Sequence, residues 1–169
     1  MLALFAEAGA FAPVWSPQIL LETRRAIPKA LLNSDMTSTE RDDHAGKVCD
    51  ALETCFPQAN ISSITVLSET PLPDPDDQHV LDLALSAGAD TIVTENLKDF
   101  PAKTLSRYGV RAINTDAFLS EIAAETPEKS EIAIQFLLQI IASPDLTRDR
   151  VLTRLKQVGL KRLARALAG

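Results

Sequence analysis

Apolar residues recur in two alternating patterns along the first 125 residues. Stretches with apolar residues three and four positions apart, typical of helices that bury one face, alternate with short β-branched or apolar runs, typical of strands. Strands that alternate with helices indicate βαβ units and predict an α/β fold with a parallel sheet. The expected strands cover residues 11–15, 61–66, 91–93 and 110–113.

Local start and stop signals bound the expected helices. Ser16 and Pro17 are typical of an N-cap and first helical position, and Gly88 is typical of a helix end. Asp116 is expected to cap a helix over residues 117–124. The other expected helices cover residues 1–9, 17–27, 39–55, 77–87 and 101–108.

A different pattern begins at Thr126. Two helical stretches, residues 128–142 and 147–168, flank Ser143-Pro144 and predict a helical extension over residues 126–169 on an α/β domain over residues 1–125. Apolar residues in the first stretch suit either the core of the chain or a homodimer contact. They are Phe136, Leu137, Ile140 and Ile141.

Charge is distributed unevenly along the chain. The net charge is −6, but residues 145–169 carry seven Lys or Arg against two Asp, about +5, which leaves about −11 on the remainder. Such a basic end suits either a solvated helix face or a surface that guides a polyanion.

Composition indicates a cytoplasmic protein that does not enter a membrane. No apolar run approaches the roughly 18 residues that span a bilayer, and no basic residue precedes the apolar start as in a signal peptide. Cys49 and Cys55 lack further zinc ligands at suitable spacing and are expected to be reduced thiols.

Acidic residues flank the expected strand at 91–93. Asp74, Asp76 and Asp77 open the preceding helix, where acids also occur simply because they favour the helix dipole, and Asn96 and Asp99 follow the strand. A helix antiparallel to the next strand begins near the end of that strand, so Asp77 and Asp99 are expected to face each other. A hard divalent cation such as Mg²⁺ would relieve their repulsion.

Glu22 lies at the edge of the apolar stripe of its helix, from which a carboxylate can reach a cleft. Arg24 and Arg25 beside it could hold a phosphate backbone, although such residues are usually only solvated. His79 suits either a metal or substrate contact or a plain helix surface.

Four stretches together resemble the PIN domain: residues 11–22, 74–80, 84–90 and 91–101. The resemblance covers roughly residues 1–120. It implies a three-layer fold with a central parallel sheet, and a Mg²⁺- or Mn²⁺-dependent ribonuclease of the kind that often forms the toxin half of a toxin–antitoxin pair.

The resemblance also implies roles for individual residues and partners. Glu22, Asp77 and Asp99 would be the catalytic and metal-binding acids, and an RNA substrate, an antitoxin protein and a second copy of the chain would be the partners. The substrate contacts implied are Thr94, Asn96, Arg24 and Arg25.

One feature of the family is not matched before Met1. PIN domains open with a strand that carries a metal-binding aspartate, and the sequence is expected to lack this strand and its ligand. A catalytically impaired PIN-like binding or regulatory protein is therefore an alternative. An unrelated α/β enzyme acting on small phosphate esters is a third hypothesis.

Overall fold

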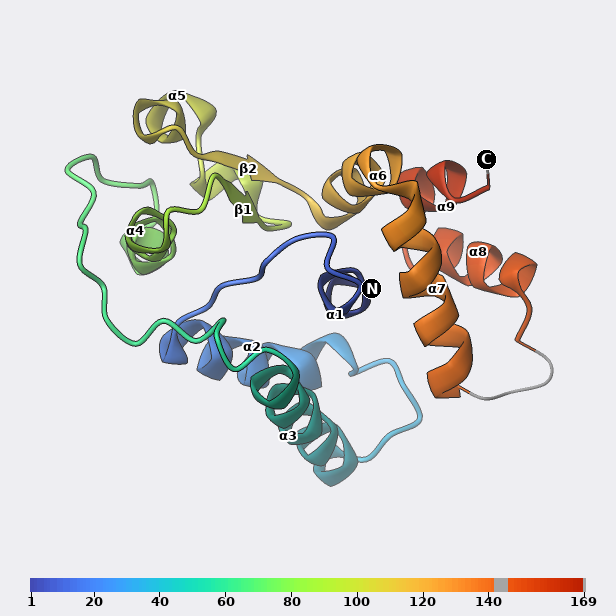
Figure 1. Ribbon diagram of the computed structural model, residues 1–169. Helices are drawn as coiled ribbons and strands as arrows, with labels where there is room; N and C mark the ends of the chain where they lie inside the picture. Colours follow the sequence, from blue (N-terminus) through green and yellow to red (C-terminus); the bar gives the residue numbers. More distant parts are fainter. Residues whose placement is uncertain (142–145, 169) are drawn as a thin grey trace. The chain divides into compact units, whose positions relative to one another are not determined.

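The computed structural model describes residues 1–141 and 146–168 and divides the chain into two compact units (Figure 1). Unit 1 joins Met1–Ala12 to Thr91–Gly169, and unit 2 is Pro13–Asp90. Unit 2 is therefore inserted between two segments of unit 1.

Unit 2 contains two long helices, α2 (Pro17–Ala30) and α3 (Ser38–Cys55), which pack on each other. The Ser16 hydroxyl accepts a hydrogen bond from the Ile19 N–H, as predicted, and Thr37 and Glu40 form a capping box at the start of α3. The 3₁₀ turn η1 (Pro75–Asp77) leads into α4 (Gln78–Ala87). Gly88 ends α4 with a φ of 67°, which confirms its predicted role.

The strands expected at residues 11–15 and 61–66 do not form. Trp15 makes a single parallel bridge with Asn60, in which the Trp15 N–H donates to Ala59 and the Trp15 carbonyl accepts from Ile61. The N–H groups of residues 65 and 66 instead donate to the hydroxyl of Ser86, each over 2.9 Å. A side chain on α4 thus satisfies donors that a neighbouring strand would otherwise have taken.

Unit 1 contains the sheet. Strands β1 (Thr91–Val93) and β2 (Arg111–Ile113) are parallel, with Ile92 opposite Ala112, which confirms two of the expected strands. Three short turns connect them: η2 (Leu97–Asp99), α5 (Ala102–Leu105) and η3 (Ser106–Tyr108).

The remaining helices of unit 1 build its core. They are α1 (Leu2–Glu7), α6 (Thr115–Glu125), α7 (Pro127–Ile141), α8 (Arg148–Gln157) and α9 (Lys161–Ala166). Phe5, Leu119, Ile134 and Leu163 are almost completely buried in one cluster, to which all five of these helices contribute. The described chain is therefore a helix-rich α/β protein with a small parallel sheet.

Two predictions about the C-terminal helices are wrong. The single helix expected over residues 147–168 breaks at Gly159, whose φ of 93° lies in the left-handed region that favours glycine. Asn114, not Asp116, caps α6 by accepting from the Ala117 N–H over 2.8 Å. The Asp116 carboxylate instead accepts from the N–H groups of Arg162 and Leu163 at the start of α9, at 3.0 Å.

The structure does not test two further expectations. The end of a helix at Ala142 and the Ser143-Pro144 connection lie outside the described residues. The boundary between a domain and an extension at residues 125 and 126 stays a prediction. Within residues 1–141 and 146–168, no helix has both the length and the apolar character needed to cross a bilayer.

Candidate functional site

Unit 2 carries an acidic turn at the start of α4. The Asp74 carboxylate accepts from the Asp76 N–H over 3.0 Å, and the Asp77 N–H donates to the Asp74 carbonyl over 3.2 Å. Pro75, with its fixed φ, suits the first position of this turn. These constraints bring one carboxylate oxygen of Asp74 and one of Asp77 within 4.8 Å of each other.

His79 connects this acidic turn to α2. Its Nδ1 lies 2.7 Å from the Asp76 carbonyl oxygen, and because a carbonyl only accepts, Nδ1 carries a proton. Its Nε2 lies 3.3 Å from a Glu22 carboxylate oxygen, but at an angle that makes no hydrogen bond, so this buried atom has no hydrogen-bond partner. Gln18 donates to the other oxygen of Glu22 over 3.1 Å. Glu22 is therefore held beside the turn.

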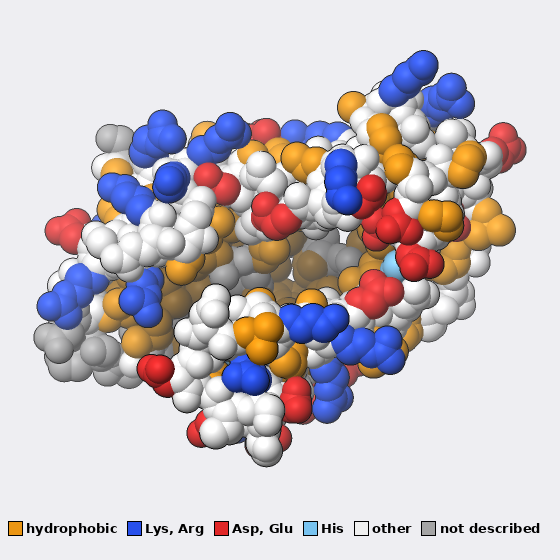
Figure 2. All heavy atoms as spheres, turned by 180° about the vertical axis from the view of Figure 1, so that it is seen from behind, with side chains coloured by type: hydrophobic (Ala, Val, Ile, Leu, Met, Phe, Trp, Pro, Cys, Tyr) orange, Lys and Arg blue, Asp and Glu red, His pale blue; other side chains and the backbone are white. Residues whose placement is uncertain are grey.

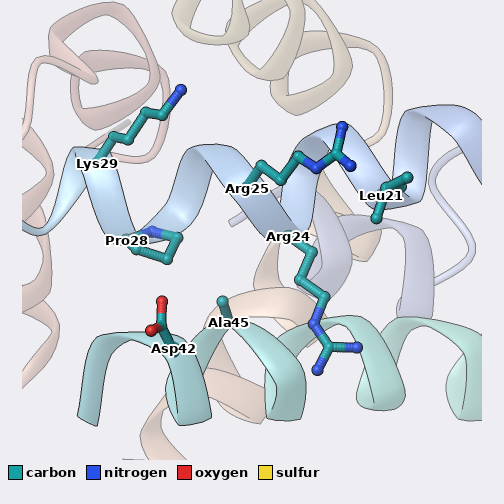
Figure 3. Close-up of a pocket in the computed structure, with 7 residues that line it drawn as sticks. All are labelled: Leu21, Arg24, Arg25, Pro28, Lys29, Asp42 and Ala45. Atoms are coloured by element: carbon teal, nitrogen blue, oxygen red, sulfur yellow. The ribbon is translucent and has the colours of Figure 1, made fainter. Parts of the chain in front are cut away.

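The basic residues of α2 point in different directions. Figure 3 shows Arg24 reaching toward α3, whereas Arg25 and Lys29 point away from it. The Arg24 guanidinium lies over Gly46, where an added Cβ would be 3.4 Å from Nη2. These residues line a groove of about 610 Å³ between α2 and α3 that Leu21, Pro28, Asp42 and Ala45 complete.

Unit 1 carries a polar loop after β1. The Thr94 N–H extends the strand ladder to the Ile113 carbonyl, and the Thr94 hydroxyl accepts from the Asn96 N–H over 3.1 Å. The Asn96 side chain donates to the carboxylate of Asp99, which is 13% exposed. Thr94, Asn96 and Asp99 are therefore assembled in one loop at the carboxyl end of a parallel strand, where ligands usually bind.

A second carboxylate fastens this loop to α6. Glu95 accepts from the Thr115 N–H, at the first position of the helix, over 3.1 Å. Negative charge is favourable there because the first N–H groups of a helix have no partner within it. The loop is thereby fixed between β1 and the start of α6.

The predicted acidic and polar site residues thus fall into two local groups, whereas Arg24 and Arg25 line the groove between α2 and α3. Unit 2 joins Glu22 to the acidic turn through His79, and unit 1 joins Thr94 and Asn96 to Asp99. That the two groups share one ion stays a prediction. Sequence reasoning left Gln18 and Glu95 out of the site. The four-residue spacing of Gln18 and Glu22 on a helix is the one signal that favours their contact.

Comparison with known proteins identifies the family. A family model described as PIN domain matches residues 2–98, more than half of the chain, and the chain belongs to this family. The chain is also 33% identical over 79 residues to a Mycobacterium tuberculosis protein named "Putative ribonuclease VapC50". The matched region covers 47% of this chain and 47% of that protein, so the chain spans about half the length of the curated relative. No solved structure matches the chain.

The chemistry of these donors fits the divalent metal that the family implies. Asp74 and Asp77 offer only oxygen ligands, which Mg²⁺ and Mn²⁺ prefer. At metal–oxygen distances of about 2.1 Å one ion spans oxygens up to roughly 4.2 Å apart. Oxygens that already lie within 4.8 Å of each other reach this separation by small side-chain rotations.

Proposed function

We propose that this protein is an endoribonuclease that depends on Mg²⁺ or Mn²⁺ and acts as the toxin of a toxin–antitoxin pair. The observation that carries the proposal is the pair of carboxylates of Asp74 and Asp77 at the start of α4 in a member of the PIN-domain family. The name of the mycobacterial relative supports ribonuclease activity.

We further propose that Glu22, Asp77 and Asp99 hold the metal together, with Asp74 beside them. In the three-layer arrangement typical of the family, the start of α4 and the carboxyl end of β1 would then lie at one edge of the sheet. A bound ion supplies a water of lowered pKa and positive charge against the scissile phosphate.

The side chains of the chain orient the ligands and the substrate in this proposal. Gln18 donates a hydrogen bond to one oxygen of Glu22, the His79 ring lies beside the other, and Asn96 donates to Asp99, so both carboxylates are restrained. A carboxylate at the site would accept the proton of the attacking water. Thr94, Asn96, Arg24 and Arg25 remain the proposed substrate contacts.

The function is tested by cleavage of a labelled single-stranded RNA in Mn²⁺. Asp77→Asn keeps the size of the side chain and removes its charge. It should lower the cleavage rate on the order of 100-fold or more, since loss of even a supporting partner of a metal ligand costs 10- to 100-fold. The matched control is Asp43→Asn, at an exposed position on α3, which should cleave like the wild type. Full activity of Asp77→Asn would end the proposal.

The sharing of one ion requires a separate test that does not measure activity. At a concentration of 100 Kd, Mn²⁺ should raise the free energy of unfolding by roughly 2.7 kcal/mol. Asp77→Asn and Asp99→Asn should each abolish this gain. Without any gain in the wild type, the alternative of a PIN-like binding or regulatory protein would hold.

Replacing the metal by Fe²⁺ locates the site in the chain. With ascorbate and peroxide, Fe²⁺ releases hydroxyl radicals that cut the backbone nearby, and mass spectrometry reads the cuts. We expect cuts near both residues 74–79 and residues 94–99. Cuts confined to one segment would refute a shared ion.

We also propose a cytoplasmic location, an antitoxin partner, a homodimer and the division into a PIN domain and a C-terminal extension. For the homodimer, Leu137 packs against the core, whereas Ile140 and Ile141 are 72% and 50% exposed and remain available for a contact. Light scattering tests this point, because Ile140→Lys should convert a dimer into a monomer.

A further inference from the structure

The helices α8 and α9 carry a concentration of exposed positive charge. Seven Lys or Arg residues and one acid, Asp149, lie between residues 146 and 168. Arg148 is engaged with the Glu131 carboxylate and the Leu167 carbonyl. The other six are exposed, and five of them form what we call the α8–α9 basic patch: Arg154, Lys156, Lys161, Arg162 and Arg165.

The side chains of this patch have no anionic partner within the described part of the chain. The ion pairs seen among residues 1–141 and 146–168 use other basic groups, such as Arg111 with Glu121 and Arg148 with Glu131. Asp116 belongs to α6, and its carboxylate, which lies at the start of α9, accepts hydrogen bonds from backbone N–H groups. Figure 2 shows Lys and Arg side chains gathered over the α8–α9 end of unit 1. In a chain with a net charge of −6, this is a local concentration of positive charge, which favours the approach of a polyanion.

Hydrogen bonds through the start of α6 connect the polar loop after β1 to α9, which carries part of the patch. Glu95 in that loop holds the Thr115 N–H over 3.1 Å, and the next residue, Asp116, holds the Arg162 N–H over 3.0 Å. The path from the Glu95 carboxylate to α9 consists of these two hydrogen bonds, the backbone between residues 115 and 116, and the Asp116 side chain. The distance from the Glu95 carboxylate to the start of α9 is therefore roughly 15 Å at most.

We infer that the α8–α9 basic patch binds the phosphate backbone of single-stranded RNA and guides it to the polar loop of residues 94–99. The choice of RNA rests on the proposed function, because that loop contains the substrate and metal contacts proposed above. The patch contains no aromatic side chain on which bases could stack, so its contacts are to phosphate and independent of sequence.

The experiment compares two doubly substituted full-length chains. Lys161→Gln with Arg165→Gln removes two charges one turn apart on α9. The control, Lys47→Gln with Lys103→Gln, removes two exposed charges from α3 and α5. Binding of a fluorescein-labelled uridine 20-mer is measured by anisotropy in EDTA between 50 and 400 mM salt, so that cleavage does not interfere.

The patch variant should lose affinity in proportion to the released counterions. Each phosphate contact contributes about 0.7 to the slope of log K against log[salt] for a single strand, so two lost contacts lower the slope by about 1.4. At 0.1 M salt this corresponds to roughly 25-fold weaker binding. The control should bind like the wild type.

Equal affinity of the two variants for RNA would overturn the inference. So would a loss confined to anionic phospholipid vesicles, which would assign the patch to a membrane surface. Cleavage in Mn²⁺ is measured in parallel. If RNA binding depends on the patch but the protein cuts no RNA, the inference about the patch would hold and the proposed function would be rejected.

Discussion

Replacing Asp116 by alanine tests how α9 is attached to the rest of unit 1. The Asp116 carboxylate accepts from two N–H groups at the start of α9, each over 3.0 Å. Loss of a capping acid typically costs about 1 kcal/mol and up to about 2 kcal/mol. The side chain of Leu163 is fully buried, so water replaces its lost partner poorly, and we expect about 1–2 kcal/mol. For a chain of this size, that corresponds to a fall in Tm of roughly 2–8 °C.

Urea unfolding measures the loss of stability, and amide hydrogen exchange measures the loss of protection at the start of α9. The free energy of unfolding should fall, and the amides of Arg162 and Leu163 should exchange faster. Asp116→Asn retains an acceptor oxygen and should recover about half of the loss. Glu128→Ala, an exposed acid in the first turn of α7, is the matched control. A cost below about 0.5 kcal/mol with unchanged exchange would refute the assigned role of Asp116.

Three further predictions concern the core, the thiols and acid stability. Phe5→Ala should lower the free energy of unfolding by about 3–5 kcal/mol in a urea titration, because the ring is fully buried. Burial raises the pKa of the Cys49 thiol, so a disulfide reagent at pH 8 should label the exposed Cys55 much faster; equal rates would contradict this. A hydrogen bond from Gln135 lowers the pKa of Glu131, so this group stabilises the fold above pH 4.5 and the effect is lost as the pH falls through the lowered pKa. Glu131→Gln should therefore flatten the loss of stability below pH 4.5, measured by urea titration across the acid range.

Elements with local signals could be predicted from the sequence. Ser16 caps the start of α2 and Gly88 ends α4, as their positions in the sequence predict, and the apolar run at residues 91–93 forms β1. The run at residues 61–66 is also rich in β-branched residues, but a strand needs a neighbouring strand, and the N–H groups of residues 65 and 66 bond to Ser86 instead. Propensity describes what a segment can form and does not specify its partner.

The site residues show the same limit: contacts between residues close in sequence could be predicted, and contacts between residues far apart in sequence could not. The bond between Asn96 and Asp99 spans three residues and follows from one motif. The contact of Glu22 with His79 joins residues on different helices, and the bond from Asp116 to α9 spans 46 residues. No local pattern encodes either one. Asp116 was expected to cap its own helix because that short-range role is the common one for aspartate.

The split composition of unit 1 has a consequence for the order in which the protein is made. Phe5 emerges from the ribosome long before α7, against which α1 packs, because α7 begins more than 120 residues further along the chain. At 5 to 20 residues per second, this interval lasts roughly 6 to 25 seconds. During that time the segment that ends at Ala12 exposes Phe5 and Phe11 to chaperones and proteases, and nascent chains should be most sensitive to chymotrypsin-like cleavage after aromatic residues before α7 is complete.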